Sequence, residues 1–210
     1  MTTRSVSTRR RYGLLVTTMF LACCMPNRGA EITITVTGTL NGGHDYLGIF
    51  GMGKGMPAGT PYTLIYTFDD TKGEPMHSTL CPGSSTGTTG SGAESPGIAM
   101  LTIAGRSHSF GKGVAPRSST WRSVASRCSI SEISVEVREG RPPFESGIKT
   151  RFGTADGRGS LTREGDWRSV LMTTSVYGRN MYNEFGITRS GNNIGGTQSY
   201  LSVNTVTISR

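Results

Sequence analysis

The alternation that decides the fold runs through EITITVTGTL, residues 31–40. Ile32, Ile34, Val36 and Leu40 share one parity of this stretch, and threonines fill most of the other. A period of two is typical of a β-strand with one buried face, because successive side chains point to opposite faces of the sheet. The stretch therefore predicts a half-buried strand whose threonines face water or a neighbouring strand.

The same alternation returns in residues 62–68, YTLIYTF, directly after Pro61. Aromatic rings and a leucine occupy its alternate positions, and the run stops at Asp69 and Asp70. Aspartates favour turns because their side chains bond to the nearby backbone. We therefore expect a second strand that ends at this pair.

Weaker strand patterns fill much of the remaining chain, with glycine-rich turns between them. They cover residues 98–104, 108–110, 131–137, 148–152, 167–176 and 200–208. Many short strands without a long 3.6-residue period indicate an all-β fold with almost no helix after the first 30 residues. The expected architecture is an antiparallel β-sandwich with jelly-roll or immunoglobulin-like connections.

Residues 31–210 are expected to form one domain, because a chain of this length buries a core without metal or several disulfides. Within it, residues 82–97 consist almost entirely of Gly, Ser, Thr and Pro. This composition buries too little apolar area to offset its ordering entropy. We therefore predict a flexible loop at residues 82–97.

Residues 1–30 have the order of a secretory signal peptide. Arginines at positions 4, 9, 10 and 11 precede an apolar run at residues 14–22, and no acidic residue occurs before Glu31. The run is shorter than the ~20 residues that a membrane-spanning helix needs. We expect cleavage after Ala30 and export to the periplasm or the extracellular space.

An alternative interpretation of residues 1–30 is a lipoprotein signal that ends at Cys23. The string FLAC, residues 20–23, is similar to a lipobox, in which the cysteine becomes the lipidated first residue. The protein would then be an outer-membrane lipoprotein acting in an envelope assembly, and only then would it be held at a membrane.

The positive charge of the chain lies largely in the leader. Lys and Arg number 22 and Asp and Glu 14, a net charge of +8, and the first 30 residues hold five of the arginines and no acid. About +3 therefore remains after cleavage. Because the remaining arginines are spaced singly, no nucleic-acid partner is expected. The arginine-rich stretch at residues 117–127 is expected to be a solvated loop, and the alternative is a contact with an acidic glycan.

Cleavage after Ala30 leaves two cysteines, Cys81 and Cys128. An even pair in an oxidising compartment predicts a disulfide, which would contribute roughly 3–4 kcal/mol by closing a loop of about fifty residues. The alternative is two separately buried free thiols.

Two strings resemble catalytic motifs but lack the context that the chemistry needs. GSSTG, residues 83–87, matches the G-x-S-x-G pattern of serine hydrolases, yet no helix pattern follows it. GIFGMGKG, residues 48–55, approaches a phosphate-binding loop, but Gly55 stands where Ser or Thr belongs and Pro57 blocks the next helix. We expect a flexible glycine loop there, and neither catalytic residues nor a cofactor.

Metal ligands and paired carboxylates also fail to form a pattern. His44, His77 and His108 are too widely separated for a zinc motif, so no metal is expected. Glu132 and Glu136 would lie roughly 13 Å apart on one strand face, beyond the separations used in glycoside hydrolysis. We expect them on the outward face of a half-buried strand.

One segment combines aromatic rings with hydrogen-bonding side chains and is the best candidate for ligand contact. Its predicted ligand-binding residues are Tyr177, Asn180, Tyr182, Asn183 and Phe185. An aromatic face offers apolar area with a polar rim, which suits a sugar. A glycan or an envelope protein is the expected kind of partner.

Three runs within residues 32–73 carry a resemblance to a known group of proteins. They are ITVTGTL at residues 34–40, GIFG at residues 48–51 and PYTLIYTFDDTKG at residues 61–73. Together they resemble the mature N-terminus of a group of uncharacterised exported bacterial proteins, some of which carry a C-terminal PEP-CTERM sorting tail. The resemblance implies an exported β-sandwich and transfers no active site, and this chain departs from the group by lacking the tail.

These patterns favour an exported, non-catalytic binding or structural module. The alternatives are a polysaccharide-active enzyme of β-sandwich fold that uses scattered carboxylates, which a linear scan does not reveal, and the lipoprotein described above.

The leader predicts the mass of the protein recovered from its native host. We expect an intact mass that begins at Glu31 and is two hydrogens lighter before reduction, because Cys81 and Cys128 are bridged. Mass spectrometry with and without reduction and alkylation measures both. A mass that begins at an acylated Cys23 would contradict this prediction and establish the lipoprotein.

Overall fold

The computed structural model describes residues 31–69, 71–78, 85–125, 130–141, 144–154, 172–175, 184–187 and 196–209. These residues form antiparallel strands, the loops between them and one turn of 3-10 helix, η1 (Gly92–Glu94). The predicted all-β antiparallel class is confirmed. No helix among these residues has the length and apolar character needed to cross a membrane.

The strands follow one another along the chain with the following bounds. They are β1 (Glu31–Asp45), β2 (Pro61–Asp69), β3 (Glu74–Ser78), β4 (Ser85–Ser91), β5 (Gly97–Ile103), β6 (Arg106–Phe110), β7 (Arg117–Ala125), β8 (Ile130–Arg141), β9 (Phe144–Thr154), β10 (Met172–Ser175), β11 (Glu184–Ile187) and β12 (Thr197–Ser209).

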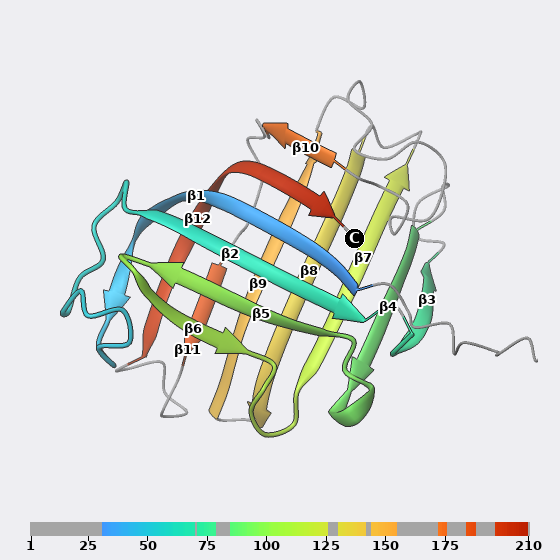
Figure 1. Cartoon of the computed structure of the whole chain (residues 1–210), viewed down its shortest axis with the longest axis horizontal. Helices are drawn as coiled ribbons and strands as arrows, with labels where there is room; N and C mark the ends of the chain where they lie inside the picture. The colour runs from blue at the N-terminus through green and yellow to red at the C-terminus, as the bar shows by residue number, and fades with distance from the viewer. Residues whose placement is uncertain are drawn as a thin grey trace, which may run out of the picture.

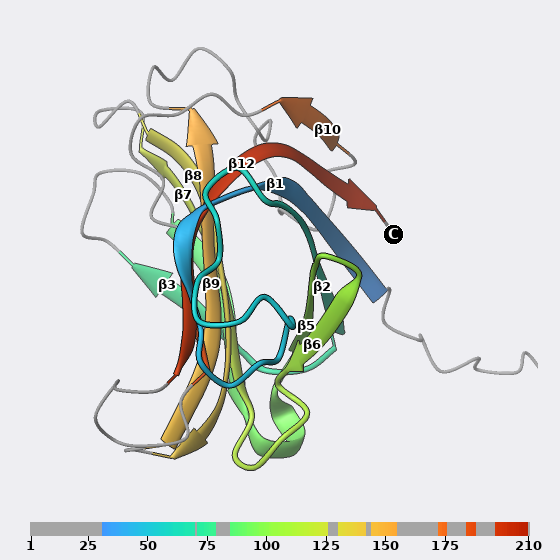
Figure 2. The ribbon, with the colours of Figure 1, turned by 90° about the vertical axis from the view of Figure 1, so that its left-hand side faces the viewer.

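All of these strands belong to one sheet, which differs from the sandwich of two sheets that the sequence predicts. The order is β3-β4-β7-β8-β9-β11-β12-β1-β2-β5-β6, and β10 pairs with β12. The sheet curls over, so that β2, β5 and β6 lie across β7, β8 and β9 (Figure 1). Seen edge-on, the two layers are joined where β1 and β12 bend from one layer into the other (Figure 2).

The bend occurs at irregularities in the β1–β12 ladder. The register shifts between Thr37 and Gly38 and again between Leu40 and Gly43. A Cβ on Gly38 would collide with the carbonyl oxygen of Ser202, and one on Gly43 with that of Gln198. Glycine is required here because bulges bend a strand and bring the two backbones into close approach.

The core lies between the two layers and follows the predicted alternation. Ile32, Ile34, Val36 and Leu40 of β1 are buried, as are the alternate residues of β2 from Tyr62 to Phe68. The facing layer contributes buried side chains at Ile133, Val135, Val137, Ile148 and Phe185. A buried hydrogen bond joins the Tyr66 hydroxyl to Thr150 Oγ1 across the layers, and burial raises the pKa of Tyr66.

The prediction of a flexible loop at residues 82–97 is wrong for the part that the structure describes. Ser85–Ser91 is strand β4, which pairs with β3 on one side and β7 on the other, and η1 follows it. A strand of Ser, Thr and Gly gains little from apolar burial, but both of its backbone edges are hydrogen-bonded and Thr88 is buried. The backbone hydrogen bonds to β3 and β7 hold this segment in a strand, although its composition does not predict one.

The presumed arginine-rich loop at residues 117–127 is corrected in the same way. Arg117–Ala125 forms β7, a strand inside the sheet between β4 and β8. Ser118 and Thr120 are buried on its inner side, and Arg117 lies on the opposite side. These two inner positions hold hydroxyl side chains, so the first half of the strand shows no alternation of apolar residues.

The glycine-rich loop between β1 and β2 is organised by one buried carboxylate. Asp45 is 1% exposed and accepts hydrogen bonds from the amides of Ile49, Phe50 and Met52 at 2.9–3.1 Å. It also accepts one from Thr197 Oγ1 at 2.9 Å, which ties the loop to the start of β12. Since these amides already donate to Asp45, they cannot bind a phosphate as the resemblance to a phosphate-binding loop would require.

Replacing Asp45 by Ala should lower the free energy of unfolding by about 3 kcal/mol or more, because it leaves several partly or fully buried donors without an acceptor. Urea unfolding followed by circular dichroism measures the change. The matched control is Asp69→Ala. The exposed Asp69 carboxylate ends β2 by accepting bonds from Thr71 Oγ1 and its amide, which lower the pKa of Asp69. The control should cost less than about 1 kcal/mol, and equal losses would contradict the structural role of Asp45.

Candidate functional site

The outer face of β7, β8, β9, β11 and β12 is the side of this layer turned away from the core. Strand alternation buries Val137, Ile148 and Phe185 and turns the residues between them outward. The pairing register arranges the outward residues in two adjacent rows that cross the strands. The first row is Arg117, Arg138, Gly147, Gly186, Gln198 and His44, and the second is Ser119, Glu136, Lys149, Glu184 and Tyr200.

Two glycines in the first row open a hollow in this face. Gly147 of β9 and Gly186 of β11 are register partners, so two neighbouring strands lack side chains at the same level. The hollow above them has a volume of about 360 Å³ and is lined by residues of β8, β9, β11 and β12. A Cβ on Gly186 would meet nothing within 4 Å, so this position faces open space.

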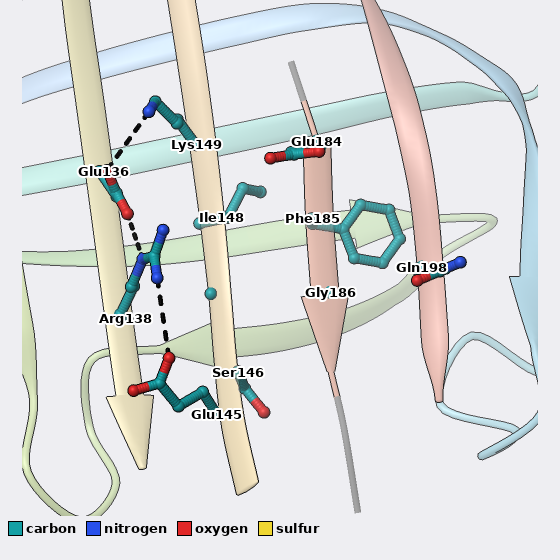
Figure 3. Close-up of a pocket in the computed structure, with 11 residues that line it drawn as sticks. Glu136, Arg138, Glu145, Ser146, Ile148, Lys149, Glu184, Phe185, Gly186 and Gln198 are labelled. Atoms are coloured by element: carbon teal, nitrogen blue, oxygen red, sulfur yellow. Dashed lines mark hydrogen bonds and ion pairs between the residues drawn. The ribbon is translucent and has the colours of Figure 1, made fainter. Parts of the chain in front are cut away.

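A chain of ion pairs forms one wall of the hollow (Figure 3). Lys149 Nζ lies 3.7 Å from Glu136, which also pairs with Arg138, and Arg138 lies 3.7 Å from Glu145. Glu145 in turn accepts a 2.6 Å hydrogen bond from Arg117. Half-exposed pairs of this kind contribute little stability each, but a network holds its side chains in a fixed arrangement.

The described charges around the hollow include both signs. Three basic side chains, Arg117, Arg138 and Lys149, stand against three acidic ones, Glu136, Glu145 and Glu184. The wall therefore offers both hydrogen-bond donors and acceptors.

Exposed aromatic rings flank the other end of the face. Tyr200 is 61% exposed and borders a second hollow of about 270 Å³, which includes Gly42, Gly43 and His44 of β1. The His44 ring stacks on Tyr46, with ring centroids 5.1 Å apart, and Tyr46 is 51% exposed. The Gln198 amide nitrogen lies 3.5 Å from His44 Nε2.

Among the predicted ligand-binding residues, the structure describes Phe185. Its ring is 2% exposed and packs edge-on against Phe50, with centroids 5.7 Å apart, so it is a core side chain beneath the two hollows. Tyr177, Asn180, Tyr182 and Asn183 lie outside the described residues. So do Cys23, Cys81 and Cys128, and both the disulfide and the lipidation stay predictions.

The carboxylates on the outer face do not have the environment of a glycosidase pair. Glu136 and Glu184 flank Lys149 in the second row, two strand spacings or about 10 Å apart at the backbone. Both carboxyl groups of such a pair must be free to reach the sugar, whereas Glu136 is ion-paired with Arg138 and Lys149. Among the residues that the structure describes, no group of three or more His, Cys, Asp or Glu side chains is placed to hold a metal ion.

No protein-family model, curated protein or solved structure matches this chain. The resemblance of residues 32–73 to exported bacterial proteins therefore stays a prediction. What the fold and the site define is an all-β protein with a polar, glycine-floored hollow on the outer face of a curled sheet.

Most residues of this site belong to no pattern that predicts a site. Gly147, Gly186, Arg138, Lys149, Gln198 and Tyr200 were not among the predicted residues. The signal that points to them is the pair of glycines that interrupt strands in ESGIK, residues 145–149, and EFGI, residues 184–187. An isolated glycine in a strand often marks a place where a ligand approaches the backbone.

The two floor glycines should differ in their tolerance of a side chain. Gly186→Val should leave the free energy of unfolding unchanged or raise it by up to about 1 kcal/mol, because its Cβ enters open space and valine favours strands. Gly147→Val should lower it by roughly 1–3 kcal/mol, because its Cβ would lie 2.9 Å from Arg138 Cγ and 3.2 Å from the Val137 carbonyl oxygen. Urea unfolding measures both, and a large loss in Gly186→Val would contradict the open floor.

Proposed function

We propose that this protein is a non-catalytic binding module that works outside the cytoplasm and takes a carbohydrate on its outer face. The observation that carries the proposal is the hollow floored by Gly147 and Gly186, with an ion-paired wall on one side and exposed Tyr200 on the other. Export is supported by the order of basic and apolar residues in the leader.

The chemistry of the outer face suits a sugar better than other ligands. An exposed tyrosine ring packs against the apolar face of a sugar ring, while fixed carboxylate, amide and guanidinium groups bond to hydroxyls. The mixed charge is a poor match for a nucleic acid. An extended peptide would need a free strand edge, whereas β8, β9, β11 and β12 are paired on both sides.

The enzyme alternative has less support. It would use Glu136 and Glu184, whose backbones lie two strand spacings or about 10 Å apart. This separation is close to the largest distance between the two carboxyl groups of an inverting glycosidase. Glu136, however, is ion-paired with both Arg138 and Lys149, so its carboxylate is already engaged by two cations. We therefore expect a bound polysaccharide to be recovered uncut after prolonged incubation.

The experiment that tests the proposal is binding of the purified protein to a panel of neutral polysaccharides, namely cellulose, xylan, galactomannan, starch and β-1,3-glucan. We expect binding to at least one of them, measured by co-sedimentation or isothermal titration. Gly186→Val and Tyr200→Ala should each weaken it about tenfold or more, because the first fills the hollow and the second removes the stacking face.

Gly55→Val is the matched control for Gly186→Val. Gly55 lies on an exposed loop outside the hollow, and its Cβ would also meet nothing within 4 Å. This variant should bind as the unmodified protein does. Unchanged binding by Gly186→Val, or a folded protein that binds none of the five polysaccharides, would overturn the proposal.

A further inference from the structure

We infer that the ligand is an extended, uncharged polysaccharide chain that crosses the strands of the outer face, and not a single sugar unit. This inference rests on the proposed function and deepens it, since it assigns the form of the ligand and the direction in which the ligand lies.

Three hollows on the outer face lie in a row and share the residues at their borders, and this row is called here the transverse groove. The hollow floored by Gly147 and Gly186 shares Glu184, Phe185 and Gln198 with the hollow beside Tyr200. It shares Glu136 and Arg138 with a third hollow of about 190 Å³, which β4 and β7 line through Thr89, Arg117, Ser118 and Ser119.

The length of the transverse groove is set by strand spacing. It extends from Thr89 on β4 through β7, β8, β9, β11 and β12 to His44 on β1, which are successive neighbours in the sheet. Six strand spacings of about 4.8 Å give roughly 29 Å. A row of hollows of this length fits a linear chain of several sugar units better than one compact ligand.

The two ends of the transverse groove differ in chemistry. Tyr200 and His44 at the β12–β1 end offer aromatic faces, whereas Thr89 and Ser119 at the β4–β7 end offer hydroxyl groups. The ion-paired residues Glu136, Arg138 and Lys149 lie between these ends and present both hydrogen-bond donors and acceptors. Stacking should therefore fix one end of the chain, and hydrogen bonds should extend its contact toward β4.

This arrangement predicts that affinity depends on chain length. Isothermal titration of a size series cut from the polysaccharide that binds best in the panel, from one sugar unit to the longest soluble oligomer, should show affinity that rises at least about tenfold between short and long members. Ser119→Tyr, which places a bulky ring in the β4–β7 end, should weaken the long oligomers about tenfold and leave the short ones unchanged.

Ser209→Tyr is the control for the added ring, because Ser209 is exposed at the end of β12 and does not line the groove. It should alter neither class of oligomer, and circular dichroism checks that both variants fold. Equal affinity for short and long oligomers, or a Ser119→Tyr variant that binds long oligomers normally, would overturn this inference while the proposed function stands. Failure to bind any neutral polysaccharide would overturn both.

Discussion

The pairing of β1 with β12 holds the two layers of this protein together (Figure 2). These two strands come from opposite ends of the described chain and pair from Thr33 with Ser209 to Asp45 with Thr197. Their bulges at Gly38 and Gly43 turn one sheet over onto itself, so that a single sheet supplies both layers of the core. Asp45 closes this ladder at one end by binding Thr197 and the amides of the following loop.

The same ladder places the candidate site. Strand β12 pairs with both β1 and β11. The register that pairs Thr197 with Asp45 also pairs Gln198 with His44 on β1. On its other side, Gln198 pairs with Gly186 of β11. Gly186 then pairs with Gly147, and the missing side chains open the hollow. The site is thus a product of register across several strands. No single segment contains it, which explains why its polar residues are scattered from Arg117 to Tyr200.

The sequence predicts the strands that bury apolar side chains on one face and little else. Residues 31–40 and 62–68 alternate clearly because β1 and β2 each cover the core with every second residue. Strand β4 carries no large apolar side chain, and β7 buries Ser118 and Thr120, so neither shows the pattern.

Phe185 was predicted to touch a ligand because its neighbours are polar, yet strand alternation turns it into the core. The outward neighbours Glu184 and Gly186 form the site, and pairing register, which sequence alone does not give, decides that outcome.

Amide NMR mapping of the protein titrated with a neutral oligosaccharide would locate the binding surface residue by residue. We expect shifts at Gly147, Gly186, Gln198 and Tyr200, followed with longer oligomers by shifts at Ser119 and Thr89. Shifts confined to the opposite layer, at β2, β5 and β6, would contradict the claim that the outer face with its glycine floor is the binding surface.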